Sequence, residues 1–260
     1  MIDSHAHLFD EQFKIDLFEV ILRAKESKID KIILPATTIE TSKISLDLNL
    51  KYNFLIPTVG IHPHEVKDVT LNDLIEIDNL AKNKNVVAIG EIGIDYFYDF
   101  APKDKQIEIF ESQIKIAIKN NLPIIVHTRD SISESISIVE EIISRNPDWR
   151  KNSFRGVFHC FTGDKPQAEK LFSLGFLIGI GGMVTFKNSS MANLISEIGI
   201  ANVILETDSP YLTPVPLRGK RNEPANVNLV ANKISEILKI DINEVERITD
   251  HNSEKLFMKL

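Results

Sequence analysis

The sequence predicts an α/β fold in which eight parallel strands, each followed by a helix, close into one barrel. Three observations support this prediction: eight short segments rich in β-branched residues recur, longer segments with helical periodicity separate most of them, and side chains that can bind a metal follow several of the short segments. Strands that alternate with helices favour parallel pairing with right-handed crossovers, and eight such units are enough to close a barrel. An open, doubly wound sheet is the alternative, because one sequence does not reveal strand order.

The expected elements follow the hydrophobic pattern from one end of the chain to the other. The clearest helix is expected at 104–120, where apolar residues from Ile107 to Ala117 recur at steps of three and four. The segment 213–226 is rich in proline, glycine and charge, so we expect a loop after the last strand. The strands are expected at 1–4, 31–36, 54–59, 86–90, 123–126, 155–158, 176–180 and 202–205.

The size and composition suit one folded domain. A chain of 260 residues with 43% hydrophobic and 26% charged residues has the composition of an ordinary globular protein, and barrels of this length form without dividing. No repeat or low-complexity linker interrupts the chain. We therefore expect residues 1–260 to form a single domain.

Charge and targeting signals narrow the function classes. With 37 acidic and 30 basic residues the net charge is -7, which argues against a broad basic face that coats nucleic acid but allows a small substrate groove. The single cysteine, Cys160, excludes an internal disulfide. Neither a leader-like start nor a long apolar span is visible, so we expect a cytoplasmic protein without a membrane or an obligate protein partner.

The first candidate metal site is the sequence Asp3-Ser4-His5-Ala6-His7. Residues two apart on an extended chain face the same way, so His5 and His7 can hold one ion while Asp3 supports them. Such a pair also arises by chance. Its position at the end of the first expected strand favours a site, because barrel active sites lie at the carboxyl ends of the strands.

The second candidate is Glu91, which follows the apolar run 86–89. A carboxylate at the end of a buried strand is costly unless it meets a cation or several hydrogen bonds. The two oxygens of Glu91 can reach different ions, so it is a candidate bridge between two metals. The alternative is a simple turn, since two glycines and Asp95 surround it, and Asp95 is expected to be structural or to support a ligand.

Three further expected strands end in residues of the same kind. His127 follows 123–126, and Arg129 shares its parity and could pair with either a phosphate or a neighbouring carboxylate. His159 follows 155–158, whereas Cys160 points the other way and is expected to be a small buried residue. Asp208 follows 202–205 on the same face as Glu206, although an aspartate there could also cap a helix. Five strand ends with such side chains together predict a metal site.

The motifs SHAHL, GIHPH, GEIGIDY, HTRD, HCFTG, ETDSPYLTP and RGKRNEP occur in this order between Ser4 and Pro224. In this order and spacing the chain resembles the TatD family of metal-dependent deoxyribonucleases. The resemblance implies a TIM-type (β/α)8 barrel of the amidohydrolase-like class, with two divalent cations and phosphodiester hydrolysis in DNA, single-stranded or at its ends. It also implies that His5, His7, Glu91 and Asp208 hold one cation, and that Glu91, His127 and His159 hold the other.

Mixed histidine and carboxylate ligands suit magnesium, manganese, cobalt or zinc. Two such cations about 3.5–4 Å apart can activate a water molecule and neutralise charge on the leaving oxygen. Glu91 and Asp208 are the expected catalytic residues, Asp208 because it is a ligand with an oxygen left to accept a proton. No serine or cysteine nucleophile is required.

The expected substrate contacts are His62, Arg129, Arg221 and Tyr211. Arg221 lies in the loop after the last strand, and the family pattern places this arginine at the mouth, although a solvated basic loop is the alternative. His62 follows the third strand closely, whereas His64 is expected to be a loop residue. Tyr211 could stack on a base or only pack against its neighbours.

Two other functions are compatible with the sequence. One is a related barrel hydrolase that cleaves an amide or ester in a small molecule, or the ester of an aminoacyl-tRNA. Many such relatives bridge their metals with a modified lysine on the fourth strand, but no lysine lies between Val86 and Asp95. The other is a non-catalytic scaffold stabilised by metal, which would leave the complete ligand set unexplained.

Overall fold

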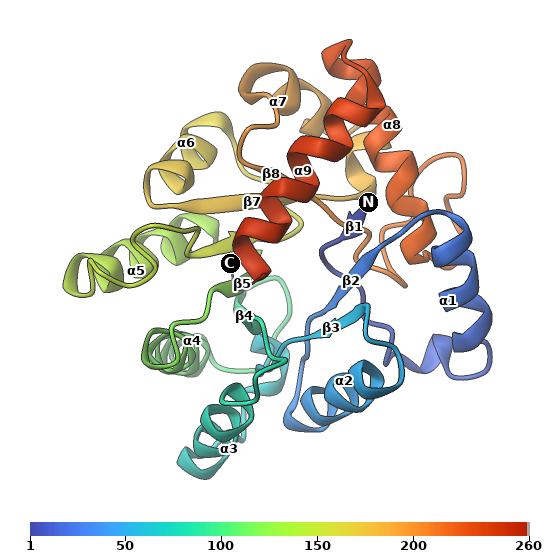
Figure 1. Ribbon diagram of the computed structural model, residues 1–260. Helices are drawn as coiled ribbons and strands as arrows, with labels where there is room; N and C mark the ends of the chain where they lie inside the picture. Colours follow the sequence, from blue (N-terminus) through green and yellow to red (C-terminus); the bar gives the residue numbers. More distant parts are fainter. Residues whose placement is uncertain (259–260) are drawn as a thin grey trace.

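Eight parallel strands form the centre of the molecule in a computed structural model, which describes residues 1–258 (Figure 1). The strands pair with their neighbours in sequence order, as β1-β2-β3 and β4-β5-β6-β7-β8. They are β1 (Ile2–Asp3), β2 (Lys31–Leu34), β3 (Leu55–Pro57), β4 (Ile89–Asp95), β5 (Ile124–Arg129), β6 (Gly156–Phe158), β7 (Phe176–Ile180) and β8 (Val203–Leu205).

Two seams close these strands into a ring. Val59 and Ile89 form a parallel bridge between the β3 and β4 regions, and Ala6 and Ser209 form another between the ends of β1 and β8. The second seam is reinforced by the Ser4 amide, which donates to the Leu205 carbonyl at 2.9 Å. The predicted (β/α)8 barrel is therefore confirmed.

Helices surround the barrel, and one follows each strand (Figure 1). Side-chain caps fix where several of them begin; Thr38 and Asp164, for example, each form a capping box with the third residue of the following helix. Short 3-10 segments lie at Glu11–Phe13, Pro63–Glu65, Gly182–Thr185 and Pro224–Asn226. The helices are α1 (Leu17–Glu26), α2 (Ile39–Lys51), α3 (Leu71–Ala81), α4 (Lys103–Lys119), α5 (Ile132–Arg145), α6 (Lys165–Ser173), α7 (Met191–Ile198) and α8 (Val227–Leu238).

A ninth helix, α9 (Ile242–Phe257), crosses one end of the barrel (Figure 1). Its last residues, Leu256 and Phe257, join a buried cluster with strand residues such as Ile33, Ile125 and Ile204. These strand residues face the barrel interior, so α9 closes the amino-terminal end. A substrate must therefore enter from the opposite end, where the strands finish.

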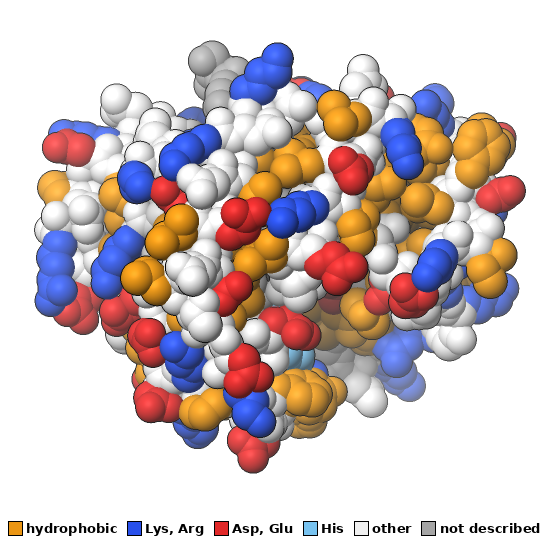
Figure 2. All heavy atoms as spheres, turned by 90° about the horizontal axis from the view of Figure 1, so that it is seen from below, with side chains coloured by type: hydrophobic (Ala, Val, Ile, Leu, Met, Phe, Trp, Pro, Cys, Tyr) orange, Lys and Arg blue, Asp and Glu red, His pale blue; other side chains and the backbone are white. Residues whose placement is uncertain are grey.

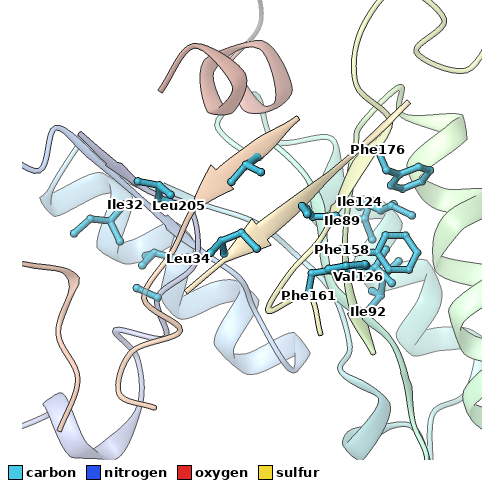
Figure 3. Packing of buried hydrophobic residues seen from close by; sticks show 14 of the residues in the cluster. Ile32, Leu34, Ile89, Ile92, Ile124, Val126, Phe158, Phe161, Phe176 and Leu205 are labelled. Atoms are coloured by element: carbon cyan, nitrogen blue, oxygen red, sulfur yellow. The ribbon is translucent and has the colours of Figure 1, made fainter. Parts of the chain in front are cut away.

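Alternate strand residues divide the core into an inner and an outer layer. The outer layer includes Ile32, Leu34, Ile124 and Val126, which belong to the large cluster shared with the helices (Figure 3). Ile125 belongs to the inner layer, so His127, two residues further on, also faces inward. Strand residues that alternate with the outer layer thus fill the barrel interior, and the next residues of the same face direct polar side chains into the mouth.

The fourth strand differs from the expectation. It was expected at 86–90, but β4 runs from Ile89 to Asp95, with a register irregularity against β5 between Ile89 and Ile92. Glu91 therefore lies within a strand, at an irregularity, and not beyond its end. The continuous apolar run 86–89 misplaces this boundary, because backbone pairing with β5 continues beyond that run to Asp95.

Candidate metal centre

A cavity of about 840 Å³ opens at the carboxyl ends of the strands. Five of the six expected ligands line it, and the sixth, His5, is fully buried beneath them. Figure 2 shows a histidine set back in a hollow at the lower edge of one face, with hydrophobic and acidic side chains around it. The lining ligands are His7, Glu91, His127, His159 and Asp208.

The first group of ligand atoms surrounds Oε2 of Glu91. His5 Nε2 lies 3.2 Å and His7 Nε2 3.5 Å from this oxygen. Oδ1 of Asp208 is 3.7 Å from His5 Nε2 and 3.4 Å from His7 Nε2. Asp208, after β8, thus meets the two histidines that follow β1, and these histidines contact one carboxylate oxygen of Glu91 in β4.

The second group surrounds the other oxygen of the same carboxylate. Oε1 of Glu91 is 2.9 Å from His127 Nδ1 and 2.8 Å from His159 Nε2, and these two nitrogens are 3.2 Å apart. Glu91 therefore turns one oxygen towards each group of histidines. This is the geometry that a carboxylate bridging two cations requires.

The donor atoms fit divalent cations. Nε2 of His5 and Nε2 of His7 approach to 3.1 Å. Burial and the neighbouring His159 lower the pKa of His5 to about 3, so its imidazole is neutral, as a metal ligand must be. Although burial alone would raise the pKa of Glu91, the surrounding histidines hold it well below its usual range. The neutral imidazole of His5 and the buried anion of Glu91 are the kinds of donor that suit a first-row divalent ion or magnesium.

Asp95 orients the candidate ligand His127. Its Oδ2 lies 3.0 Å from His127 Nε2 and 2.8 Å from His64 Nε2. Burial would raise the pKa of Asp95, but hydrogen bonds from the two histidines hold it well below its ordinary value. Since Nε2 of His127 is occupied by Asp95, its Nδ1 is directed to Glu91, the usual way in which a carboxylate fixes a ligating imidazole.

Asp3 has a different task from the one expected of it. Its carboxylate accepts hydrogen bonds from the Thr207 amide at 2.9 Å, the Thr207 hydroxyl at 2.6 Å and the His5 amide at 3.3 Å. It therefore ties the end of β1 to the end of β8 through the backbone, and the imidazoles are not its partners. Burial raises the pKa of Asp3 to about 8.

Glu206 is a buried carboxylate next to the second group. Its Oε1 is 3.8 Å from His159 Nδ1 and accepts a hydrogen bond from the Cys160 amide at 2.5 Å. Burial raises its pKa to about 7. Cys160 as a residue is partly exposed and lines the cavity, which differs from the expected full burial, and its backbone adopts φ 45°. Burial of the thiol and nearby carboxylates raise its pKa well above the usual range, which leaves a poor nucleophile.

The expected substrate contacts divide into two sets. His62, Arg129 and Tyr211 line the cavity. Arg221 is not among the lining residues; its guanidinium bonds Asp16 at 2.7 Å and Glu223 at 2.9 Å. The structure therefore places Arg221 in an ion-pair network that holds the loop, a role that the sequence of a basic loop does not reveal.

Sequence reasoning missed other residues of the site. His64 was expected to be a loop residue, yet it lines the cavity and bonds Asp95. Phe9 and Phe97 also line the cavity. The aromatic run after the GEIGID motif was the available signal for Phe97, since a surface loop has little reason to be so apolar.

As a candidate ligand, His159 should make metal binding dependent on pH. Burial would lower its pKa, but the charge of Glu91 and their hydrogen bond overcome this and raise it to about 9. A protonated imidazole cannot bind a cation, so binding below this pH must release a proton and grow tighter as the pH rises, roughly tenfold per unit. Calorimetric titration of metal-free protein with cobalt(II) at pH 6.5, 7.2 and 7.9, in buffers of different ionisation enthalpy, measures both effects. Equal affinity at the three pH values without proton release would contradict this assignment.

The family model described as TatD related DNase matches residues 2–258. An uncharacterized metal-dependent hydrolase of Bacillus subtilis, YabD, is 39% identical over 99% of this chain and 98% of its own length. A protein of Edwardsiella piscicida named 3'-5' ssDNA/RNA exonuclease TatD is 30% identical over 99% of both chains.

Solved structures show the same fold. The crystal structure of YjjV, a TatD homologue of Escherichia coli, superposes with a TM-score of 0.91 at 28% identity, over 100% of this chain and 98% of that chain.

Among residues 1–258, no helix combines the length and the apolar character needed to cross a membrane.

Proposed function

The chain belongs to the family of TatD-related DNases and is a metal-dependent hydrolase, and from this premise we propose that it cleaves phosphodiester bonds in DNA, working from an end of a single strand. The relatives support the substrate class, because some of them are named as exonucleases acting on single-stranded DNA and RNA. We further propose that the whole chain, 1–260, acts as one domain.

One observation carries the proposal: the two oxygens of Glu91 face two separate groups of ligand atoms. His5, His7 and Asp208 would hold one divalent cation on Oε2, and His127 and His159 the other on Oε1. Such a pair of cations supplies a water molecule of lowered pKa and positive charge for the phosphoryl oxygens.

The chain's own residues supply the remaining functions. Burial would raise the pKa of Asp208, but its hydrogen bond with His7 and nearby imidazoles lower it, so its carboxylate is ionised at neutral pH and able to accept a proton. Asp95 keeps His127 in one orientation. Arg129, which lines the mouth, would meet a phosphate, and His62, whose Nε2 lies 3.5 Å from Glu91 Oε1, would lie close to the reacting bond.

Product analysis tests this proposal. Purified protein would be incubated with 5'-labelled single- and double-stranded DNA in magnesium, manganese, cobalt or zinc, with EDTA as the control. We expect stepwise release of nucleotides from single strands with at least one of the ions, and none with EDTA. Intact DNA with all four ions, together with hydrolysis of a simple ester or amide, would overturn it in favour of a small-molecule hydrolase.

A further inference from the structure

We propose that the loop after β4 carries a platform on which an unpaired nucleobase of the substrate stacks. The platform consists of Phe97, Tyr98 and Phe100, and we call it the aromatic lip. This inference rests on the proposed function. It adds the feature of the same site that would favour single-stranded over double-stranded DNA.

The aromatic lip exposes large apolar rings where folded proteins normally bury them. Phe97 is 55% exposed, Tyr98 41% and Phe100 53%. The rings also contact one another: the Phe97 and Tyr98 centroids are 4.8 Å apart, and those of Tyr98 and Phe100 are 5.2 Å apart. An exposed aromatic cluster of this kind usually marks a binding surface.

The lip is continuous with the metal centre. Phe97 lines the same cavity as the ligands. The Phe100 ring lies 4.7 Å from the His64 ring, and His64 shares Asp95 with the ligand His127. A nucleotide whose phosphate lies at the cations therefore has aromatic faces within its reach.

The loop is held in place by the residue that orients His127. Oδ1 of Asp95 accepts hydrogen bonds from the backbone amides of Phe97 at 2.9 Å and Tyr98 at 3.2 Å. The Asp95 amide itself donates to Gln106 of α4 at 2.8 Å. Because this backbone is anchored, the rings lose little freedom when they meet a ligand, which favours binding.

Arg129 prepares one ring for stacking. Its guanidinium carbon lies 3.7 Å from the centre of the Phe97 ring and 4.8 Å from that of Tyr98. The cation covers part of the Phe97 ring, and the exposed remainder of the ring can take a base. A guanidinium, a ring and a base then form one continuous stack.

The charges of the cavity explain why stacking is needed. Arg129 is the one Lys or Arg among the described residues that line the cavity. Six carboxylates line it as well: Asp10, Glu65, Glu91, Asp95, Asp130 and Asp208. Outside the cations, such a surface offers a polyanion little electrostatic attraction, so contacts to the bases must supply affinity. In a duplex both faces of each internal base are covered by neighbours, so the lip favours an unpaired base.

A comparison of two oligonucleotides tests the lip. One is oligothymidylate, and the other carries base-free tetrahydrofuran residues at its three terminal positions at the cleaved end. For Phe97→Ala we expect the KM for oligothymidylate to rise by about 5- to 150-fold, the range for loss of one base–aromatic stack, with kcat little changed. With the base-free oligonucleotide the variant and the wild type should behave alike.

Matched variants and a binding measurement complete the design. Phe18→Ala removes a ring that is 61% exposed on α1 and should change neither KM. Phe97→Tyr keeps an aromatic ring at this position, so its KM should equal that of the wild type. Fluorescence anisotropy of labelled oligothymidylate in EDTA measures binding without cleavage, so the lip is tested even if the protein does not hydrolyse DNA.

Two results would overturn the proposal. The first is that Phe97→Ala changes KM and binding affinity equally for both oligonucleotides, or changes them for neither. The other is a dimer in sedimentation velocity that Phe97→Ala converts to monomer while KM stays unchanged, since the lip would then be a contact between copies of the chain. A failure of the proposed function appears separately, as wild-type protein that leaves both oligonucleotides intact.

Discussion

Glu91→Gln should abolish hydrolysis while leaving the fold intact. The substitution preserves shape but removes the negative charge that both groups of ligands share. Since loss of a single stabilising donor commonly costs about 10²–10³-fold in kcat, loss of the proposed bridging ligand should cost at least that much. Steady-state nuclease kinetics and metal content by mass spectrometry measure the two effects together.

The control for this variant is Glu76→Gln, an exposed carboxylate on α3 that pairs with Lys43. It should match the wild type in activity and metal content. Circular dichroism and thermal unfolding establish that Glu91→Gln is folded. Full activity of Glu91→Gln with two ions still bound would contradict the bridging role.

Asp208→Asn should lower kcat by about 10²–10⁴-fold, the usual contribution of a group that moves a proton in the transition state. Asp208 faces His5 and His7, and its carboxylate is ionised at neutral pH, whereas an amide cannot accept the proton. The acidic limb of the kcat–pH profile should also change, because the titrating base is gone. Rapid-mixing kinetics at saturating metal separate this loss from weaker metal binding.

Asp104→Asn, at the exposed start of α4, provides the matched control and should leave the profile as in the wild type. A different outcome for Asp208→Asn would count against proton transfer: if saturating metal restored kcat fully, Asp208 would serve only as a ligand.

The sequence alone predicted the barrel and the six candidate ligands that gather at its mouth. Strand signals are local, because alternating or continuous apolar runs can be recognised without their partners. His127 and His159 directly follow apolar strand residues, so their position at the mouth followed from the barrel topology. The boundaries of β4 did not follow, since its pairing with β5 continues through Glu91 and beyond it.

Tertiary structure decided how those residues act on one another. Only the ring closure between β1 and β8 brings Asp208 to His5 and His7, and only the packing of α1 against the last loop pairs Arg221 with Asp16. The role of His64 and the exposure of the aromatic lip likewise depend on Asp95, which anchors a loop that the sequence left undefined. The sequence determines which residue types occur and on which face of a strand each one lies. The site residues are separated by about 30 to 200 positions in the chain, and they come close in space only because burial of the barrel core brings their strands together.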